Sequence, residues 1–392
     1  MKELISHKVN SIPPSGIRRF FDLIATMEGV ISLGVGEPDF VTPWHIREAA
    51  VYAIEQGYTT YTSNAGLPQL RQAISKRLYD DYNLTYSSDD EVLITVGVSE
   101  ALDLILRAII NPGDEIIIPE PCYVSYKSCT ILAGGIPVII STRDTGFKVT
   151  PEQIESAITP KTKAILISYP SNPSGAALNR DELMAIAEII KKHNILVISD
   201  EIYGLLSYDQ PYTSIASLHG MRDRTILLDG FSKAYAMTGW RVGYAAGHKD
   251  IIGAMCKIHQ YSMLCASIVS QMAAVEALKN GRVQMEQMRN EYNHRRRLIV
   301  DGFNRIGLRC FMPEGAFYAF PSIMSTGLNS EEFAEKLLFE EKVAVVPGTV
   351  FGDCGSGYIR CSYATSLENI EEALERIQRF VEKCQLLDRT TR

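Results

Sequence analysis

The chain has 392 residues, of which 46% are hydrophobic and 22% are charged, and its formal net charge is -7. This composition is typical of a globular protein with a large core, and the length allows two domains. The acidic balance argues against a general nucleic-acid surface, and no apolar run reaches the roughly 20 residues that a membrane helix needs. The first 20 residues lack the apolar core of a signal peptide, so we expect a cytoplasmic protein.

Eight cysteines are scattered along the chain. None of them forms a CxxC motif, and none lies near a pair of histidines with the spacing of zinc ligands. We therefore expect buried or incidental thiols, with neither a disulfide framework nor a metal site.

From about residue 90 the chain alternates short apolar runs with helical patterns. These runs are continuously apolar, which is typical of strands that are covered on both faces. Strands that alternate with helices predict an α/β fold with a mainly parallel sheet. Seven runs are expected to form the sheet: 92–96, 115–119, 137–141, 164–168, 196–200, 225–229 and 241–247.

Two of the intervening helices have clear start signals. Thr150 is followed by Pro151, Glu152 and Gln153, and Asn179 is followed by Arg180, Asp181 and Glu182. Both patterns predict a capping box at the first turn of a helix.

Beyond residue 250 the pattern changes to that of a smaller α+β domain. A long helical stretch is expected over roughly 250 to 305, a helix capped by Ser330, and a final amphipathic helix from about Leu367. Strand-like runs lie at 315–323, 343–348 and 357–364. The predicted division is an N-terminal arm that joins the small domain at 1–45, a large domain at 46–285 and a small C-terminal domain at 286–392.

Ligands of open parallel sheets bind beyond the carboxyl ends of the strands, so the residues that follow each run are candidates for a site. An amine in an apolar site, such as that of Lys233, has a lowered pKa and becomes a nucleophile. Ser232, Arg241 and the turn at 97–99, which leads into a helix, suit a phosphate. Asp200 could pair with a protonated ring nitrogen.

Three further residues complete the pattern. Tyr203 and Asn172 could bind a ring hydroxyl, and Tyr123 offers a flat face on which a ring can stack. An aldehyde, a phosphate, a pyridine nitrogen and a phenolic hydroxyl together describe pyridoxal phosphate.

The motifs YPSNPSG (169–175), SDEIY (199–203) and GFSKAYAMTGWRVGY (230–244) closely resemble those of the class I and II aminotransferases, which have the fold type I of the pyridoxal phosphate enzymes. VGEPDF (35–40), YTSNAGLPQLR (61–71) and YIRCSYA (358–364) fit the same pattern. Within the family, the sequence is similar to the branch that holds the prokaryotic aspartate, aromatic and N-acetyl-diaminopimelate aminotransferases.

The resemblance implies a role for each candidate. Lys233 would bind the cofactor aldehyde and move the substrate proton, and Asp200 would be the partner of the ring nitrogen. The remaining cofactor contacts would be Val98, Ser99, Tyr123, Asn172, Tyr203, Ser232, Arg241 and, across a homodimer interface, Tyr61. The substrate carboxylate would be bound by Arg360, with help from Asn172 and the Gly36 amide.

The implied activity is transfer of an amino group from an L-amino acid, with aspartate or an aromatic amino acid favoured, to a 2-oxo acid such as 2-oxoglutarate. A C–S β-lyase or a decarboxylase that uses the same cofactor is the closest alternative. A regulator that senses pyridoxal phosphate is disfavoured because the acidic chain begins directly with the arm. A short-chain dehydrogenase is a distant alternative: Tyr123 and Lys127 match its YxxxK motif, but the glycine-rich turn that it needs is missing.

Overall fold

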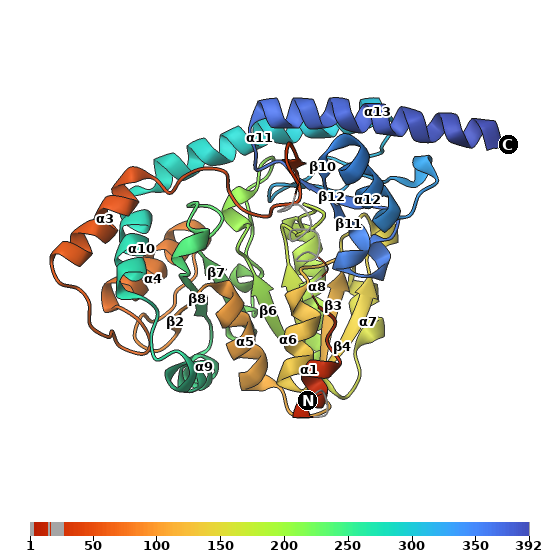
Figure 1. The fold of residues 1–392 in the computed structure, drawn as a ribbon. Coiled ribbons are helices and arrows are strands. Elements are labelled where there is room, and N and C mark those ends of the chain that lie inside the picture. Colours follow the sequence, from red (N-terminus) through yellow and green to blue (C-terminus); the bar gives the residue numbers. More distant parts are fainter. Residues whose placement is uncertain (1–3, 15, 17–26, 392) are drawn as a thin grey trace.

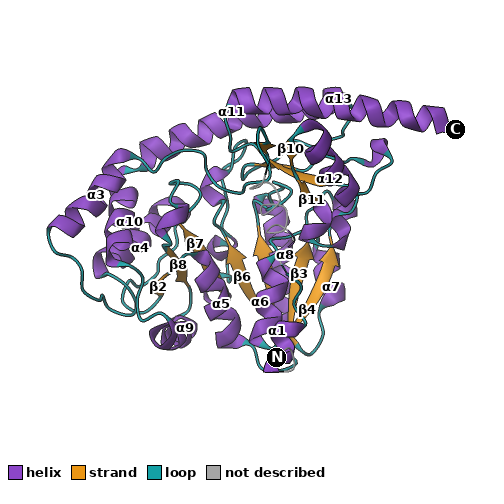
Figure 2. Cartoon of the chain, in the orientation of Figure 1, coloured by secondary structure: helices purple, strands orange, loops and turns teal. Residues whose placement is uncertain are grey.

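The computed structural model describes residues 4–14, 16 and 27–391. A seven-stranded sheet lies at its centre, between helices (Figures 1 and 2). In spatial order its strands are β2 (Val92–Thr95), β8 (Gly243–Ala246), β7 (Thr225–Gly230), β6 (Leu196–Asp200), β5 (Thr162–Ser168), β3 (Glu115–Glu120) and β4 (Ile136–Ser141).

All seven predicted strands are present, and the sheet is mainly parallel, as predicted. β8 is the exception, because it pairs antiparallel with both β2 and β7. β4 lies at an edge, where Ile136 and Ile139 are exposed, so its apolar run is not covered on both sides.

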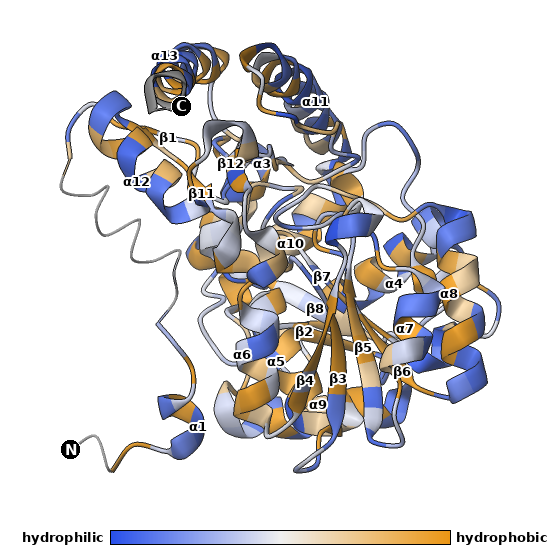
Figure 3. Cartoon of the chain, turned by 90° about the vertical axis from the view of Figure 1, so that its right-hand side faces the viewer, coloured by the Kyte–Doolittle hydropathy of each residue, from blue (hydrophilic) through white to orange (hydrophobic). Residues whose placement is uncertain are grey.

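Helices cover both faces of the sheet, which explains why the strands are continuously apolar. Side chains such as Ile116, Leu166 and Ile198 pack on one face against α5 (Val98–Ile109), α6 (Ser125–Ala133) and α9 (Lys249–Ser262). On the other face, side chains such as Ile165 and Val197 pack against α7 (Pro151–Ala157) and α8 (Arg180–His193). At the β2 end, α3 (Trp44–Glu55), α4 (Pro68–Tyr82) and α10 (Ile268–Asn280) complete the cover. Figure 3 shows the strands as an apolar layer within this cover.

The capping boxes at Thr150 and Asn179 are confirmed. The stretch predicted over 250–305 consists of three helices, α9, α10 and α11 (Arg282–Ile306). Leu264, in the left-handed region at φ 69°, lies in the first break, and Gly281 forms the second. Capping by Ser330 is wrong, because Asn329 is the N-cap of α12 (Ser330–Glu341) and accepts the Glu332 amide.

The second part of the molecule contains a three-stranded sheet of β11 (Val346–Pro347), β12 (Ile359–Ser362) and β9 (Tyr318–Ala319). α11, α12 and α13 (Leu367–Thr391) pack on it, and α11 and α13 run side by side (Figure 1). The run predicted at 315–323 forms only the short β9, because Ala316 has a left-handed φ of 59° and Pro321 has no amide proton to donate.

Near the N-terminus, α1 (His7–Asn10) lies against α6, and β1 (Ile31–Ser32) pairs in parallel with β10 (Val343–Ala344). The N-terminal segments therefore contact both a helix that covers the large sheet and, through β1, the second part of the molecule. Within the described residues, none of the helices is long and apolar enough to cross a membrane.

Candidate active site

The carboxyl ends of the parallel strands of the large sheet face the second part of the molecule (Figure 1). A cavity of about 610 Å³ lies between these strand ends and the second part. Eleven of the twelve predicted site residues line this cavity. These are Gly36, Val98, Ser99, Tyr123, Asn172, Asp200, Tyr203, Ser232, Lys233, Arg241 and Arg360.

Lys233 follows β7, and its amine donates a hydrogen bond of 2.7 Å to the Gly36 carbonyl oxygen. Burial lowers the pKa of this amine to about 8. The negative charges of Glu37 and Asp200 raise the pKa, and the positive charges of Arg360 and Arg241 lower it. The lysine is thus a far better nucleophile near neutral pH than a solvated lysine.

Asp200 ends β6 and is buried. Its Oδ2 accepts a hydrogen bond from the Tyr126 hydroxyl at 2.8 Å, and its Oδ1 accepts one from the Ile202 amide at 3.2 Å. Burial raises the pKa of Asp200 to about 6, and these two hydrogen bonds oppose the rise. The group is a carboxylate above that pH, held in a fixed direction and suited to a cationic partner.

The turn at Gly97 forms the start of α5, where the Val98 and Ser99 amides are free of intrahelical partners. Gly97 has a left-handed φ of 77°, and a Cβ there would lie 2.6 Å from an Arg241 guanidinium nitrogen. Arg241 is held beside this turn by a hydrogen bond of 3.0 Å to the Thr238 carbonyl. A helix N-terminus and a guanidinium that approach a glycine turn form a cradle for an anion.

Arg360 lies in β12 and is almost fully buried. Nη1 donates to Asn172 Oδ1 at 3.0 Å, and Nη2 donates to the Gly34 carbonyl at 2.6 Å. Its buried Nε has no hydrogen-bond partner among the described residues. Arg360 lines the cavity, and each of its Nη groups carries a second proton, so the guanidinium is suited to a carboxylate.

Tyr61 is the exception among the predicted residues, because it is 81% exposed and does not line the cavity of its own chain. Two residues that sequence reasoning missed do line it: Tyr126, which holds Asp200, and Tyr318, whose hydroxyl lies 2.7 Å from that of Tyr203. No local motif marks either tyrosine, because both contacts join positions far apart in the chain.

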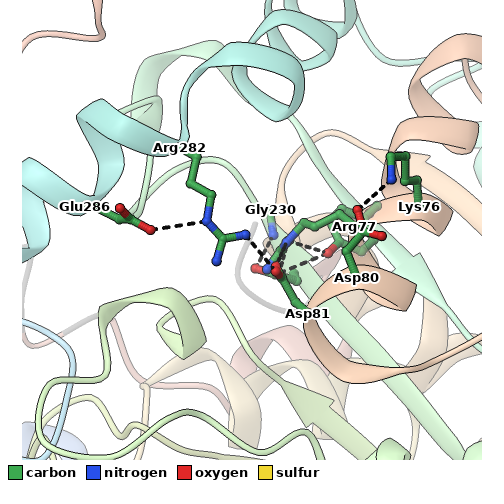
Figure 4. Close-up of polar contacts among 9 residues, drawn as sticks. Lys76, Arg77, Asp80, Asp81, Gly230, Arg282 and Glu286 are labelled. Carbon is green, nitrogen blue, oxygen red and sulfur yellow. Dashed lines mark hydrogen bonds and ion pairs between the residues drawn. The ribbon is translucent and has the colours of Figure 1, made fainter.

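A buried ion pair lies behind the segment that carries Lys233. Arg77 in α4 donates at 2.7 Å to Asp229, the penultimate residue of β7, and at 2.7 Å to the Tyr244 hydroxyl. Asp229 also accepts the Gly230 amide at 2.6 Å. Figure 4 shows Arg77, Asp81 and Arg282 meeting in this region, so the pair connects α4, β7 and α11.

The model of the family described as aminotransferase class I and II matches residues 28–377. This chain is a class I and II aminotransferase. A Bacillus subtilis (strain 168) protein named YugH and described as an aminotransferase is 58% identical to it over 98% of this chain and 100% of the relative. The aspartate aminotransferase of Pyrococcus abyssi is 44% identical, with 97% of this chain and 99% of the relative covered.

Among solved structures, the aromatic aminotransferase of Pyrococcus horikoshii OT3 superposes with a TM-score of 0.90 at 43% identity, covering 94% of this chain and 100% of that one. The predicted fold, family and enzyme class are thereby confirmed. Enzymes of this class use pyridoxal phosphate. The site fits that cofactor, since it offers a buried amine, a carboxylate and an anion cradle in one cavity.

We expect Arg77→Gln to lower the free energy of unfolding by about 3–5 kcal/mol, because it leaves the Asp229 carboxylate buried without its ion-pair partner. Urea titration would measure the loss. Lys76→Gln is the matched control, since Lys76 and Asp80 form an exposed pair one position earlier (Figure 4) that contributes less than about 1 kcal/mol. Equal losses in the two variants would contradict the role of the buried pair.

Lys233 in the cofactor-free protein should titrate near pH 8, well below ordinary lysines. Since burial disfavours the charged form, about one molecule in ten carries the neutral amine at pH 7, against about one in three thousand for a solvated lysine. NMR of reductively ¹³C-methylated protein would show one early-titrating signal, which Lys233→Ala would remove. Glu37→Gln should move the midpoint further down. An early signal that persists in Lys233→Ala belongs to another residue.

Proposed function

We propose that this aminotransferase takes the amino group of aspartate or an aromatic amino acid and delivers it to 2-oxoglutarate in a ping-pong cycle. The observation that carries this proposal is the convergence of the buried amine of Lys233 and the guanidinium of Arg360 on one cavity, beside the Asp200 carboxylate. Relatives named for aspartate and for aromatic amino acids support the choice of donors.

The proposed roles are those that the resemblance to the family implies, and the position of each group supports them. Pyridoxal phosphate supplies an aldehyde that links to amino groups and a ring that takes up electrons from the substrate. Lys233 Nζ is the group that would hold the aldehyde and, once free, would take the proton from the substrate Cα and deliver it to the former aldehyde carbon of the cofactor. Asp200 keeps the ring nitrogen protonated, because its carboxylate is fixed by Tyr126 and has few other partners.

The other residues bind and orient. Ser232, Arg241 and the amides of Val98 and Ser99 hold the phosphate, and Tyr123 packs against the ring. Tyr203 and Asn172 donate to the ring oxygen; Asn172 has its amide nitrogen available because Arg360 uses its Oδ1. Arg360 binds the substrate carboxylate, with the Gly36 amide beside it.

We also propose the division of the chain given above, with the arm at 1–45, the large domain at 46–285 and the small domain at 286–392. The pairing of β1 with β10 supports placing the arm with the small domain. The eight cysteines are unpaired, as is usual for proteins of the reducing cytoplasm, where we place the enzyme.

Lys233→Ala should remove the absorption band of the link between cofactor and lysine from the cofactor-loaded protein, because that covalent link is lost. Borohydride should trap the cofactor on the wild-type peptide that contains Lys233, as mass spectrometry would show. Lys127→Ala, which changes an exposed lysine, is the control and should keep the band. In a panel of aspartate, phenylalanine, tyrosine, alanine and N-acetyl-diaminopimelate, aspartate or the two aromatic amino acids should give the fastest formation of pyridoxamine phosphate and the matching 2-oxo acid in the wild type. Release of ammonia or carbon dioxide instead would identify a lyase or a decarboxylase.

The exposed position of Tyr61 leads us to propose a homodimer in which this hydroxyl reaches the phosphate of the partner subunit. Tyr61→Ala and Lys233→Ala should each be nearly inactive alone, while a refolded mixture should regain activity. A mixed dimer holds one site with both defects and one site with neither, so up to about one quarter of the wild-type activity should return, since half of the dimers are mixed and each has one intact site. No recovery in a mixture shown to contain mixed dimers would place Tyr61 outside the partner's site.

A further inference from the structure

Two buried tyrosines meet inside the cavity from different parts of the molecule. Tyr203 follows β6 in the large sheet, and Tyr318 lies in β9 of the second part. Their hydroxyl oxygens are 2.7 Å apart, and their rings pack edge to face with centroids 5.7 Å apart. The exposed fractions are 4% for Tyr203 and 1% for Tyr318, so bulk water does not compete for the contact.

Tyr318 also lies against Arg360 and Gly36, the two residues that are proposed to bind the substrate carboxylate together with Asn172. The guanidinium of Arg360 lies over its ring, 4.6 Å from the centroid, which is a favourable position for a cation and an aromatic face. On the arm, a Cβ at Gly36 would lie only 2.7 Å from the Tyr318 hydroxyl oxygen. Tyr318 thus lies between Tyr203, Arg360 and Gly36.

The number of protons fixes the direction of the hydrogen bond once the cofactor is bound. A phenol has a single proton to donate, and Tyr203 needs it for the ring oxygen of the cofactor. The contact of 2.7 Å can then persist only if Tyr318 donates and Tyr203 accepts. Among the described residues, Tyr203 is the hydrogen-bond partner that the structure gives to the Tyr318 hydroxyl, so no other acceptor competes for this proton.

We propose that Tyr318 is a positioning residue that donates a hydrogen bond to Tyr203 and so strengthens the bond from Tyr203 to the ring oxygen of the cofactor. A hydroxyl that accepts a hydrogen bond becomes a better donor, and the effect is larger in a buried site. Because Arg360 packs on the same ring, Tyr318 also connects the group that binds the substrate carboxylate with the group that binds the cofactor. This inference rests on the proposed function of Tyr203 and Arg360.

Four charged side chains face this pair of tyrosines or the nearby amine of Lys233, and all four remain in the variants proposed below. Asp200 from β6 and Arg360 from β12 face Tyr203. Glu37 from the arm and Arg241 from the segment before β8 act on Lys233 together with those two. A change caused by the Tyr318 hydroxyl must therefore be measured with all four charges in place.

Tyr318→Phe in the cofactor-loaded enzyme removes only the hydroxyl and keeps the ring under Arg360. The ring oxygen of the cofactor then receives a weaker hydrogen bond and holds the proton on the Lys233 nitrogen more tightly. The pH midpoint of the cofactor absorption spectrum should therefore rise by about 0.5 pH unit. We expect kcat/KM to fall by roughly 3- to 10-fold, the loss of one ordinary hydrogen bond.

Tyr363→Phe is the matched control. Tyr363 is equally buried, and its hydroxyl donates at 3.1 Å to the Ala316 carbonyl, away from the cavity lining. It should lower stability by a similar amount and leave the spectral midpoint unchanged. If Tyr318→Phe and Tyr363→Phe have the same midpoint, the inference is wrong, although the proposed function stands. A wild type that never acquires a cofactor band would overturn the proposed function itself.

Gly36→Ala tests the same contact without removing a tyrosine, so it is informative even if Tyr318→Phe folds poorly. The added methyl group must displace the Tyr318 hydroxyl, and the midpoint should rise as it does in Tyr318→Phe. In the double variant Gly36→Ala/Tyr318→Phe, the methyl group meets no hydroxyl and should shift the midpoint little beyond the single variants. Additive shifts, or no shift in Gly36→Ala, would show that Tyr318 does not act through Tyr203.

Discussion

The withdrawal of the Lys233 amine from water is the constraint on which the rest of the site depends. A lysine whose pKa is lowered by burial needs apolar surroundings and few anions, while the cofactor and substrate expected here are both anionic and need cations nearby. The structure meets both demands by separating the charges. The guanidinium of Arg241 lies beside the turn before α5 and Arg360 lies in β12, and each lowers the pKa of the amine further. The same two arginines therefore attract anions and keep the lysine reactive.

This arrangement needs a rigid frame, because the amine sits on a loop just past the end of β7. The frame is built into the sheet itself. Gly243 of β8 lies so close to Gly97 and Val98 that a Cβ on it would be 2.9 Å from their backbone atoms, which brings the start of α5 against β8. On the far side of the loop, Asp229 is tied to Arg77 and to the Gly230 amide. Buried carboxylates are tolerated when they are paired, and here the pair also fixes the direction in which the chain leaves the strand.

The sequence was a good guide to those parts of the structure that depend on neighbours along the chain. Seven strands, two capping boxes and the turn at Gly97 follow from local patterns, and all eleven of the predicted residues that line the cavity lie just after predicted strands or in quoted motifs. The prediction of Ser330 as the cap overlooks a local signal, since only Asn329 has a glutamate three residues later and forms the capping box that the structure shows.

What could not be predicted depends on contacts between distant segments. Tyr126 reaches Asp200 across 74 positions, and Tyr318 reaches Tyr203 across 115. Both are aromatic residues that no motif distinguishes, so a role in the core is the default expectation for them. Tyr61 is a different case, since its predicted partner belongs to another chain, and a single chain shows only that the side chain is free to meet one.

The number of cationic side chains that line the cavity narrows the choice of amino-group donor. Among the described residues that line the cavity, the cations are Lys233, Arg241 and Arg360. The proposed function uses all three, for the aldehyde, the phosphate and the substrate carboxylate. An aromatic side chain needs no further cation, and the half-buried Tyr123 and the apolar Val35, Leu102 and Ile202 offer it suitable walls. Aspartate carries a second carboxylate, so efficient use of aspartate requires a cation that is not part of this lining. In the proposed dimer, the partner subunit already brings Tyr61 to the site and could also supply this cation. A preference for aspartate over phenylalanine would therefore itself be evidence that the site is shared between two chains.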